Sequence, residues 1–397
     1  MTIEEIGKTK CTGCALCSRL CVKQCITMQP DNEGFLFPVI DHSVCIDCSI
    51  CYKQCPLNQE QEVLDKPIYY AAAISNKEEL LNSSSGGLFI AMAKWIIGNG
   101  GYVCGCVFDE NMKPTHICTN RYEEVYKMMG SKYVQSTIQP VYEIIREITD
   151  QKKPLLFTGT ACQIAAVKKV VKNIECLYLV DILCHGVPSP LFFNKYIAFL
   201  EKKHKGKVQK IEFRNKKELG WGSEHRTYYE IEKKGIVKSY RPALPAYFCS
   251  FFWGIDLRES CYNCKFAKAE RITDITIGDF WGYWSYYHRR FPEGISVASV
   301  NTEKGKLIWS KIVSELSLCD ELSAEHAKGT NTNFYHPTIR PDTRDCFYKN
   351  IADLSYEKFI WRTYLDKNCR KKLLVSIYGR FFPQKLQDII RKFKKKD

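Results

Sequence analysis

CTGCALCSRLC at residues 11–21 and CIDCSICYKQC at residues 45–55 are the two stretches that decide how the amino-terminal part of this chain folds. In each stretch three cysteines stand at gaps of two residues, and a fourth follows after three more. Every cysteine of the second run lies 34 positions after its counterpart in the first, so the segment is an internal duplication. Pro56 follows the second run, whereas Val22 stands at the equivalent position of the first.

This cysteine spacing is the one with which bacterial ferredoxins bind two 4Fe–4S clusters. A cubane cluster presents its irons at tetrahedral corners, so it takes three thiolates from one tight loop and a fourth from elsewhere, which in these ferredoxins is the last cysteine of the other run. The rule predicts a first cysteine set of Cys11, Cys14, Cys17 and Cys55, and a second cysteine set of Cys45, Cys48, Cys51 and Cys21. Paired structural zinc sites are the alternative, but zinc knuckles rarely carry three such cysteines in duplicate. Cys25 falls outside the pattern and is predicted to be a packed free thiol.

Length and composition limit the class of protein. The chain has 397 residues, 21 of them cysteines, and 45% of its residues are hydrophobic, which predicts two or three globular domains. The first residues lack the basic and apolar regions of a signal peptide, and the most apolar helical run, residues 88–97, is short and contains Lys94. We therefore expect a cytoplasmic protein whose clustered cysteines serve metal or redox chemistry rather than disulfides.

The formal net charge of +14 is unevenly distributed. Residues 1–62 are acidic, at −3, whereas residues 353–397 carry a local charge of +8. No aromatic-stacking or helix-turn-helix pattern accompanies the basic end, so we do not expect nucleic acid as a partner. An apolar stripe with helical spacing runs through this end, at Leu386, Ile389, Ile390 and Phe393. It predicts a helix that packs on the protein's own core or makes a weak peripheral contact with the anionic inner face of the membrane.

The region after residue 62 alternates short apolar runs with helical patterns, which is typical of an α/β fold with sites at the carboxyl ends of parallel strands. We predict an antiparallel hairpin within residues 208–240 and helices at residues 88–97, 163–171 and 191–203. Strands are predicted at residues 69–75, 101–109, 115–119, 154–158, 176–183, 272–279 and 294–300.

A third group of cysteines lies in this region and is called here the third cysteine set: Cys162, Cys184, Cys261 and Cys264. Two of its members follow predicted buried strands, whose carboxyl ends converge in a parallel sheet. The spacing alone leaves three interpretations open, namely a further iron–sulfur cluster, ordinary buried thiols, and a zinc knuckle at Cys261 and Cys264.

The Ser/Gly-rich segment at residues 83–87 and His185 each have two interpretations, one functional and one structural. Ser83-Ser-Ser-Gly-Gly precedes a predicted helix, where backbone N–H groups can bind a phosphate, although the same residues also suit a simple helix cap. His185 is a candidate proton donor, although a single histidine in a turn is more often structural. The sequence contains no Ser/His/Asp triad and no complete Walker or Gly-x-Gly-x-x-Gly pattern.

Together with the duplicated cysteines, the ordered motifs between residues 8 and 300 resemble those of the coenzyme F420 hydrogenase/dehydrogenase beta-subunit family. The motifs are Ser-Ser-Gly-Gly (84–87), Gly-Ser-Lys-Tyr-Val-Gln (130–135), Gly-Thr-Ala-Cys-Gln (159–163), Asp-x-x-Cys-His-Gly-Val-Pro-Ser-Pro (181–190), Phe-Arg-Asn-Lys (213–216), Leu-Arg-x-Ser-Cys-Tyr-x-Cys (257–264) and Asp-Ile-Thr-Ile-Gly-Asp-Phe-Trp-Gly (274–282). The resemblance implies an FAD-binding α/β domain in which the third cysteine set holds its own 4Fe–4S cluster. The implied flavin site consists of Ser84, Ser85, Gly86, Gly87, Lys132, Tyr133, Thr158, Gly159, Thr160 and Asp279. Ala161 departs from the family pattern, which has proline there.

The sequence patterns predict a mixed α/β protein (α+β overall) of three parts: a small ferredoxin-like domain at residues 1–62 with two 4Fe–4S clusters, a mixed-sheet domain at 63–340, and a basic helical extension at 341–397. The resemblance implies that the domain at 63–340 binds FAD and a further 4Fe–4S cluster. The expected activity is that of a ferredoxin-linked oxidoreductase, in which a ferredoxin or another low-potential carrier exchanges electrons with three clusters and FAD, and FAD with an organic substrate. Lys132 would steady the reduced flavin and His185 would donate a proton. The alternative is a non-catalytic electron-transfer subunit that docks on a separate redox enzyme.

Overall fold

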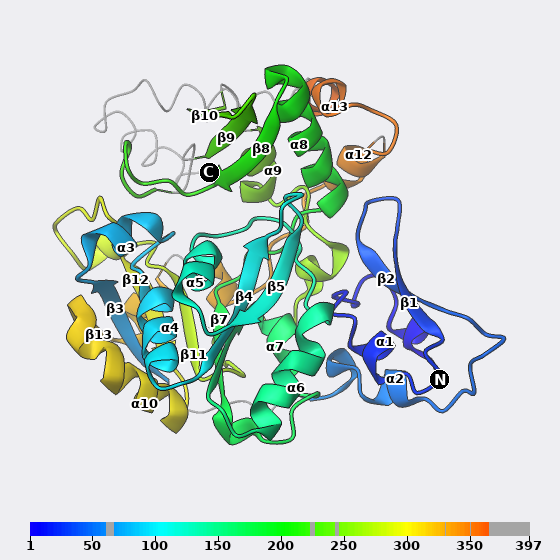
Figure 1. Cartoon of the computed structure of the whole chain (residues 1–397), viewed down its shortest axis with the longest axis horizontal. Helices are drawn as coiled ribbons and strands as arrows, with labels where there is room; N and C mark the ends of the chain where they lie inside the picture. Colours follow the sequence, from blue (N-terminus) through cyan, green and yellow to red (C-terminus); the bar gives the residue numbers. More distant parts are fainter. Residues whose placement is uncertain (61–66, 223–226, 243–245, 330, 350, 365–397) are drawn as a thin grey trace. The chain divides into compact units, whose positions relative to one another are not determined.

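A computed structural model describes residues 1–60, 67–222, 227–242, 246–329, 331–349 and 351–364 (Figure 1). The chain divides into two compact units, Met1–Pro341 and Asp342–Asp397. The described part of the second unit contains α12 (Arg344–Tyr348) and α13 (Tyr356–Tyr364), whose Phe347 and Phe359 rings pack edge to face with centroids 4.7 Å apart. The predicted amphipathic helix with Leu386 and Phe393 lies outside the described residues. A division of the first unit at residue 62 remains a prediction.

The centre of the first unit is an eight-stranded mixed sheet with the strand order β13-β3-β12-β11-β7-β6-β4-β5. Strands β4, β6, β7 and β11 are parallel to one another, and β5, β12 and β13 are antiparallel to their partners. The strands are β3 (Ile68–Ile74), β4 (Tyr102–Phe108), β5 (Pro114–Thr119), β6 (Leu155–Gly159), β7 (Leu177–Ile182), β11 (Ile275–Asp279), β12 (Ser296–Val300) and β13 (Leu316–Leu322). The mixed α/β prediction is confirmed, and β13 is the strand of this sheet that the sequence analysis missed.

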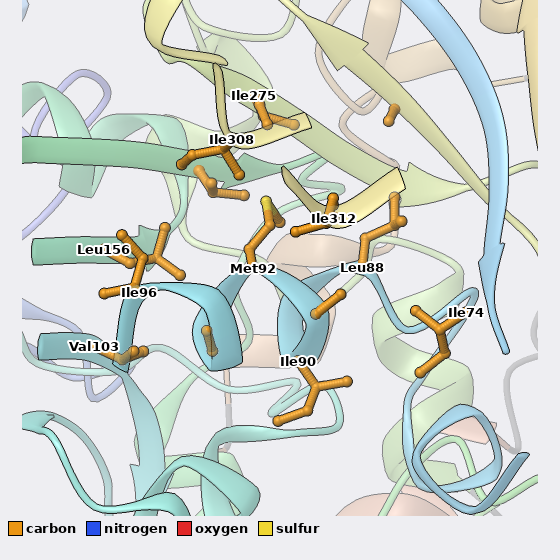
Figure 2. Packing of buried hydrophobic residues seen from close by; sticks show 14 of the residues in the cluster. Ile74, Leu88, Ile90, Met92, Ile96, Val103, Leu156, Ile275, Ile308 and Ile312 are labelled. Carbon is orange, nitrogen blue, oxygen red and sulfur yellow. The ribbon is translucent and has the colours of Figure 1, made fainter. Parts of the chain in front are cut away.

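Strand residues alternate between the two faces of the sheet, because successive side chains of a strand point in opposite directions. In β6, Leu156 joins the core on one face, whereas Leu155 and Phe157 join the core on the other. The first core is closed by α4 (Leu88–Gly98), α5 (Tyr122–Met128) and α10 (Glu303–Ile312). Figure 2 shows Met92 of α4 among the buried side chains of this core. The second core is closed by α6 (Tyr142–Asp150) and α7 (Ala161–Val167).

The amino-terminal segment repeats its local structure as the sequence repeats its cysteines. Helix α1 (Leu16–Leu20) begins after Ala15, and α2 (Ile50–Lys53) begins after Ser49, both of which have a positive φ, of 63° and 60°. Such a backbone is uncommon for residues other than glycine, so a shared left-handed turn at equivalent positions reflects the duplication. Strands β1 (Ile26–Pro30) and β2 (Leu36–Ile40) form an antiparallel pair between the two helices.

The remaining elements of the first unit support the sheet. The predicted hairpin forms as β9 (Tyr228–Lys233) and β10 (Ile236–Tyr240), and β8 (Lys207–Glu212) extends it to a three-stranded antiparallel sheet. The other helices are α3 (Lys77–Asn82), α8 (Pro190–His204), α9 (Ala246–Phe252) and α11 (Ala324–Lys328). Helix α7 ends at Val167, four residues before the predicted end. Among the helices described, none combines the length and the apolar character needed to cross a membrane.

Candidate redox centre

The first cysteine set lines one pocket beneath the amino-terminal loop. Cys11 and Cys14 belong to the loop that leads into α1, Cys17 lies in α1, and Cys55 is the N-cap of a short 3-10 helix, Pro56–Asn58. The pocket is otherwise largely apolar, with Ile3, Ile6, Leu16 and Leu57 in its wall. Burial raises the pKa of the Cys14 thiol to about 12, and the neighbouring thiols of Cys11 and Cys55 add to the shift. Thiolates crowded in such a pocket need a compensating positive charge.

The second cysteine set lines another pocket, closer to the chain start. Cys45 and Cys48 come from the loop before α2, Cys51 lies in α2, and Cys21 is the C-cap of α1. Cys48 is exposed, unlike any other member of the three sets. Cys25 is buried, as predicted for a packed thiol, but it also lines this pocket, with its Sγ 3.4 Å from that of Cys21.

The third cysteine set comes together at the carboxyl edge of the sheet. Cys162 lies in the first turn of α7, after β6, and Cys184 follows the adjacent parallel strand β7. Cys261 lies in a 3-10 helix, Glu259–Asn263, and Cys264 is its C-cap. All four line a single pocket, and burial followed by the charge of Cys264 raises the pKa of Cys162 to about 12. The strand pattern alone placed only Cys162 and Cys184 at this edge, and the resemblance implied that Cys261 and Cys264 join them, which they do through tertiary packing.

Cys14 connects the first and third cysteine sets. It lines the pocket of the first set and also the pocket of the third. The thiol of Cys162 is one of the groups that raise the pKa of Cys14. The first and second sets pack around one apolar cluster with Ile3, Ile6 and Ile26. The three sets therefore lie in series, in the order second, first, third.

The donor chemistry of each set fits a cubane cluster. Each set supplies four cysteine sulfur atoms around one pocket, and the second pocket is also lined by Cys25 and Asp47 and the third by His185. Among the described residues, no group of three or more His, Cys, Asp or Glu side chains could hold a metal ion as the side chains stand. The four thiolates of a cubane bind four different irons, so they lie farther apart than the ligands of a single tetrahedral zinc.

The segment Ser84–Gly87 is occupied by contacts within the protein. Ser84 Oγ accepts a 2.7 Å hydrogen bond from the Ser131 amide, and Ser85 Oγ donates a 2.8 Å bond to the Ile295 carbonyl. A Cβ at Gly86 would lie 2.2 Å from the Ala72 carbonyl oxygen, so glycine is needed there for close packing on β3. Gly86 is therefore explained by packing within the protein. Gly87, with φ +83°, is the N-cap of α4, which is the helix-cap interpretation of this segment.

Lys132 caps a helix. Its Nζ donates hydrogen bonds to four carbonyl oxygens at the end of α5, those of Lys127, Met128, Met129 and Gly130, over 2.8–3.1 Å. An ammonium group has three N–H donors, so these carbonyls account for its hydrogen-bonding capacity. The predicted role of Lys132 beside a flavin would therefore require the α5 cap to open.

Tyr133 and Asp279 are both hydrogen-bonded to Arg214, a residue to which the sequence analysis gave no role in the site. Arg214 donates from Nη1 to Asp279 Oδ2 at 2.8 Å and to the Tyr133 hydroxyl at 3.0 Å. Trp221 Nε1 also donates to Asp279, at 3.2 Å. Arg214 is buried, and Asp279 ends β11 at the carboxyl edge of the sheet. The Phe-Arg-Asn-Lys motif contained the signal for Arg214, but its partner is 65 residues away in sequence.

Thr158, Gly159 and Thr160 lie where β6 ends and α7 begins. Thr160 and Gln163 form a capping box, and Thr160 Oγ1 lies 3.1 Å from Cys162 Sγ. The carbonyl of Thr158 lies 3.2 Å from Nε2 of His116, a buried histidine that the sequence analysis missed. Burial lowers the pKa of His116 to about 4, so its ring is neutral at physiological pH.

His185 belongs to the surroundings of the third cysteine set. It lines the same pocket as Cys184 and Cys261, and its Nδ1 lies 3.2 Å from the Thr338 hydroxyl. Its ring packs edge to face on Phe251, with centroids 5.2 Å apart. Burial lowers its pKa, which favours the neutral ring.

Known proteins with similar sequences or structures include the following. Residues 152–321 match the family model for the carboxyl-terminal part of the coenzyme F420 hydrogenase/dehydrogenase beta subunit. The F subunit of the F(420)H(2) dehydrogenase of Methanosarcina mazei is 21% identical over 333 residues, which cover 80% of this chain and 86% of that protein. A chain of the xenon-derivatised F420-reducing NiFe hydrogenase complex of Methanosarcina barkeri is 17% identical, with 75% of this chain and 91% of that chain covered and a TM-score of 0.43.

Proposed function

Because the chain belongs to the coenzyme F420 hydrogenase/dehydrogenase beta-subunit family, we propose that it is an iron–sulfur electron-transfer protein of an oxidoreductase system. When bound, 4Fe–4S clusters accept and release single electrons. The observation that carries the proposal is the series of three cysteine sets, joined where Cys14 lines two of the pockets. Each set would hold one cluster, with its four cysteine sulfurs as ligands.

The second cysteine set is the proposed contact with a soluble carrier, a ferredoxin or another low-potential protein. Cys48 is exposed there, and apolar side chains surround it: Met1 is 65% exposed, Val22 69% and Ile46 55%. Exposed apolar groups around a redox centre favour a short-lived protein contact. The first and third sets lie deeper, with Cys55 buried and Cys162 and Cys184 partly so.

We further propose that FAD binds at the carboxyl edge of the sheet and links the clusters to an organic substrate. FAD supplies the exchange between single-electron and two-electron chemistry. Ligands of open α/β sheets bind outside the carboxyl ends of the strands, and Thr158, Thr160 and Asp279 stand at these ends. Arg214 orients Asp279 and Tyr133 there, and the neutral His185 is the proposed proton carrier.

The second candidate is a non-catalytic subunit that passes electrons to a separate redox enzyme. The Methanosarcina mazei relative, which is one subunit of a dehydrogenase, favours it. Anaerobic purification of the full chain tests both candidates. Bound flavin and turnover of an organic substrate by the isolated chain would support the enzyme. Clusters without flavin, together with stable co-purification of a redox partner, would support the non-catalytic role.

A further inference from the structure

Arg258 is the largest fully buried side chain of the described structure, with 1% of its surface exposed. It lies three residues before Cys261, immediately before the 3-10 helix Glu259–Asn263. Its amide donates a 3.0 Å hydrogen bond to the Val187 carbonyl, which fixes its backbone next to the Cys184 turn. The backbone of Arg258 therefore links the loop of Cys184 to the 3-10 helix that contains Cys261.

The guanidinium of Arg258 reaches the first cysteine set. Its Nε donates to the Cys11 carbonyl at 2.8 Å, and its Nη2 donates to the Leu36 carbonyl at 2.9 Å and lies 3.7 Å from Cys11 Sγ. The group also stacks over the Phe37 ring, 4.1 Å from its centroid. A single side chain thus joins residues 11–37 to the third cysteine set.

The cysteine loop is shaped to receive this side chain. Gly13 has φ +69°, and a Cβ on it would lie 2.9 Å from Arg258 Nη1. Gln135 completes the contact, since its Oε1 accepts from Arg258 Nη1 at 3.1 Å and its Nε2 donates to the Thr12 carbonyl at 2.9 Å. The approach is close enough that any side chain at residue 13 would force the guanidinium away.

The charge of Arg258 has no carboxylate partner among the described residues. The contrast is Arg271, another buried arginine lining the same pocket, which forms an ion pair with Asp181. A buried charge without a counter-ion is costly in free energy. Four cysteine thiolates around a cluster carry net negative charge, and Arg258 lies between two such sets.

We propose that Arg258 raises the reduction potentials of the first and third centres. The inference rests on the proposed function, because it requires clusters in these two cysteine sets. Reduction adds one electron to a centre, and a fixed positive charge beside that centre stabilises the added charge. A hydrogen bond to a ligand sulfur acts in the same direction. The second set does not contact Arg258 and serves as an internal reference.

The test is a potentiometric titration of anaerobically purified full-length protein, followed by electron paramagnetic resonance. The variants Cys264→Ser and Cys48→Ser assign the signals of the third and second centres. Arg258→Met removes the charge while keeping an unbranched side chain, and Arg258→Lys keeps the charge without the planar fork. Arg340→Met is the matched control, because Arg340 lies nearby but pairs with Glu259.

We expect Arg258→Met to lower the potentials of the first and third centres by at least 59 mV, a tenfold change in the one-electron equilibrium, with the second centre unchanged. Arg258→Lys and Arg340→Met should keep the potentials near those of the unaltered protein. Unchanged potentials in an Arg258→Met protein with full iron would overturn the proposal. If the Arg258→Met protein does not incorporate its clusters, Arg258→Lys becomes the test. This variant keeps the positive charge, so a fall of 59 mV or more in the potentials of the first and third centres would overturn the proposal. Absence of iron from the unaltered protein would instead refute the proposed function.

Discussion

The hydroxyl of Tyr142, on helix α6, donates a 2.7 Å hydrogen bond to the carbonyl oxygen of Cys14. Tyr142 is 1% exposed and belongs to the core beneath the sheet, whereas Cys14 belongs to the amino-terminal cysteine loop. The bond therefore holds the loop of the first cysteine set on the α/β layer. Together with Arg258 and Gln135, it places the first and third sets next to each other.

Tyr142→Phe should remove this bond and leave the Cys14 carbonyl without its buried donor. We expect a loss of roughly 1–3 kcal/mol in the free energy of unfolding, which is the usual effect of leaving a buried acceptor unsatisfied. Denaturant titration of the variant and the unaltered protein measures the difference. Tyr122→Phe is the control, because Tyr122 is 41% exposed, and an equal loss in both variants would contradict the role of the bond.

The proposed clusters predict the metal content. Anaerobically purified protein should carry about 12 iron and 12 sulfide per chain, from three cubanes of four irons each. Cys264→Ser should lose about four irons and leave the other two centres intact, because the sets share no ligand. Iron and acid-labile sulfide assays measure this. Cys319→Ser is the control, since Cys319 lies on β13 away from all three pockets, and iron loss there would point to general damage. Zinc without sulfide would refute the proposal.

Asp279→Asn should destabilise the protein and weaken flavin binding. It removes the charge partner of Arg214, whose side chain is 5% exposed, and a broken buried pair typically costs about 3–5 kcal/mol. Denaturant titration and flavin absorbance after unfolding measure the two effects. Asp320→Asn is the matched control on another strand of the sheet. Gly86→Asp would not serve as a test, because its side chain would strike the Ala72 carbonyl whether or not flavin binds there.

His116 predicts a pH dependence of stability. Burial lowers the pKa of the His116 ring to about 4 in the folded protein, from the value of 6.5 that an unburied histidine has. Between these values the unfolded chain binds a proton that the folded protein excludes, so stability falls as the pH decreases from about 6.5 to 4. The loss from this group should be on the order of 3 kcal/mol at pH 4.

His116→Gln should flatten this part of the pH profile, as measured by denaturant titration at pH 4, 5, 6 and 7. The control is His42→Gln, which removes a histidine whose side chain is 63% exposed rather than buried. A profile of His116→Gln as steep as that of the unaltered protein would show that other groups cause the acid sensitivity.

Local patterns in the sequence were sufficient for much of the fold. The apolar run at residues 154–158 corresponds to β6, and the period of 3.6 residues located α4 and α8, because side-chain periodicity follows from which face of an element is buried. Helix α7 ends earlier than its pattern predicted, and β13 was missed, because its residues are only partly buried and form an edge strand. Edge strands lack the strong apolar signal that burial on both faces imposes.

The sequence by itself determined the two cysteine repeats, their 34-residue displacement and the alternating strands and helices, since these depend on spacing along the chain. Only the tertiary structure decided which distant groups meet. It brought Cys261 and Cys264 to Cys162 and Cys184, turned Lys132 onto the carbonyls of α5, and placed Arg258 against Cys11, 247 residues away. Such contacts arise from the packing of whole elements, and the charge that a buried residue faces cannot be read from its neighbours in sequence.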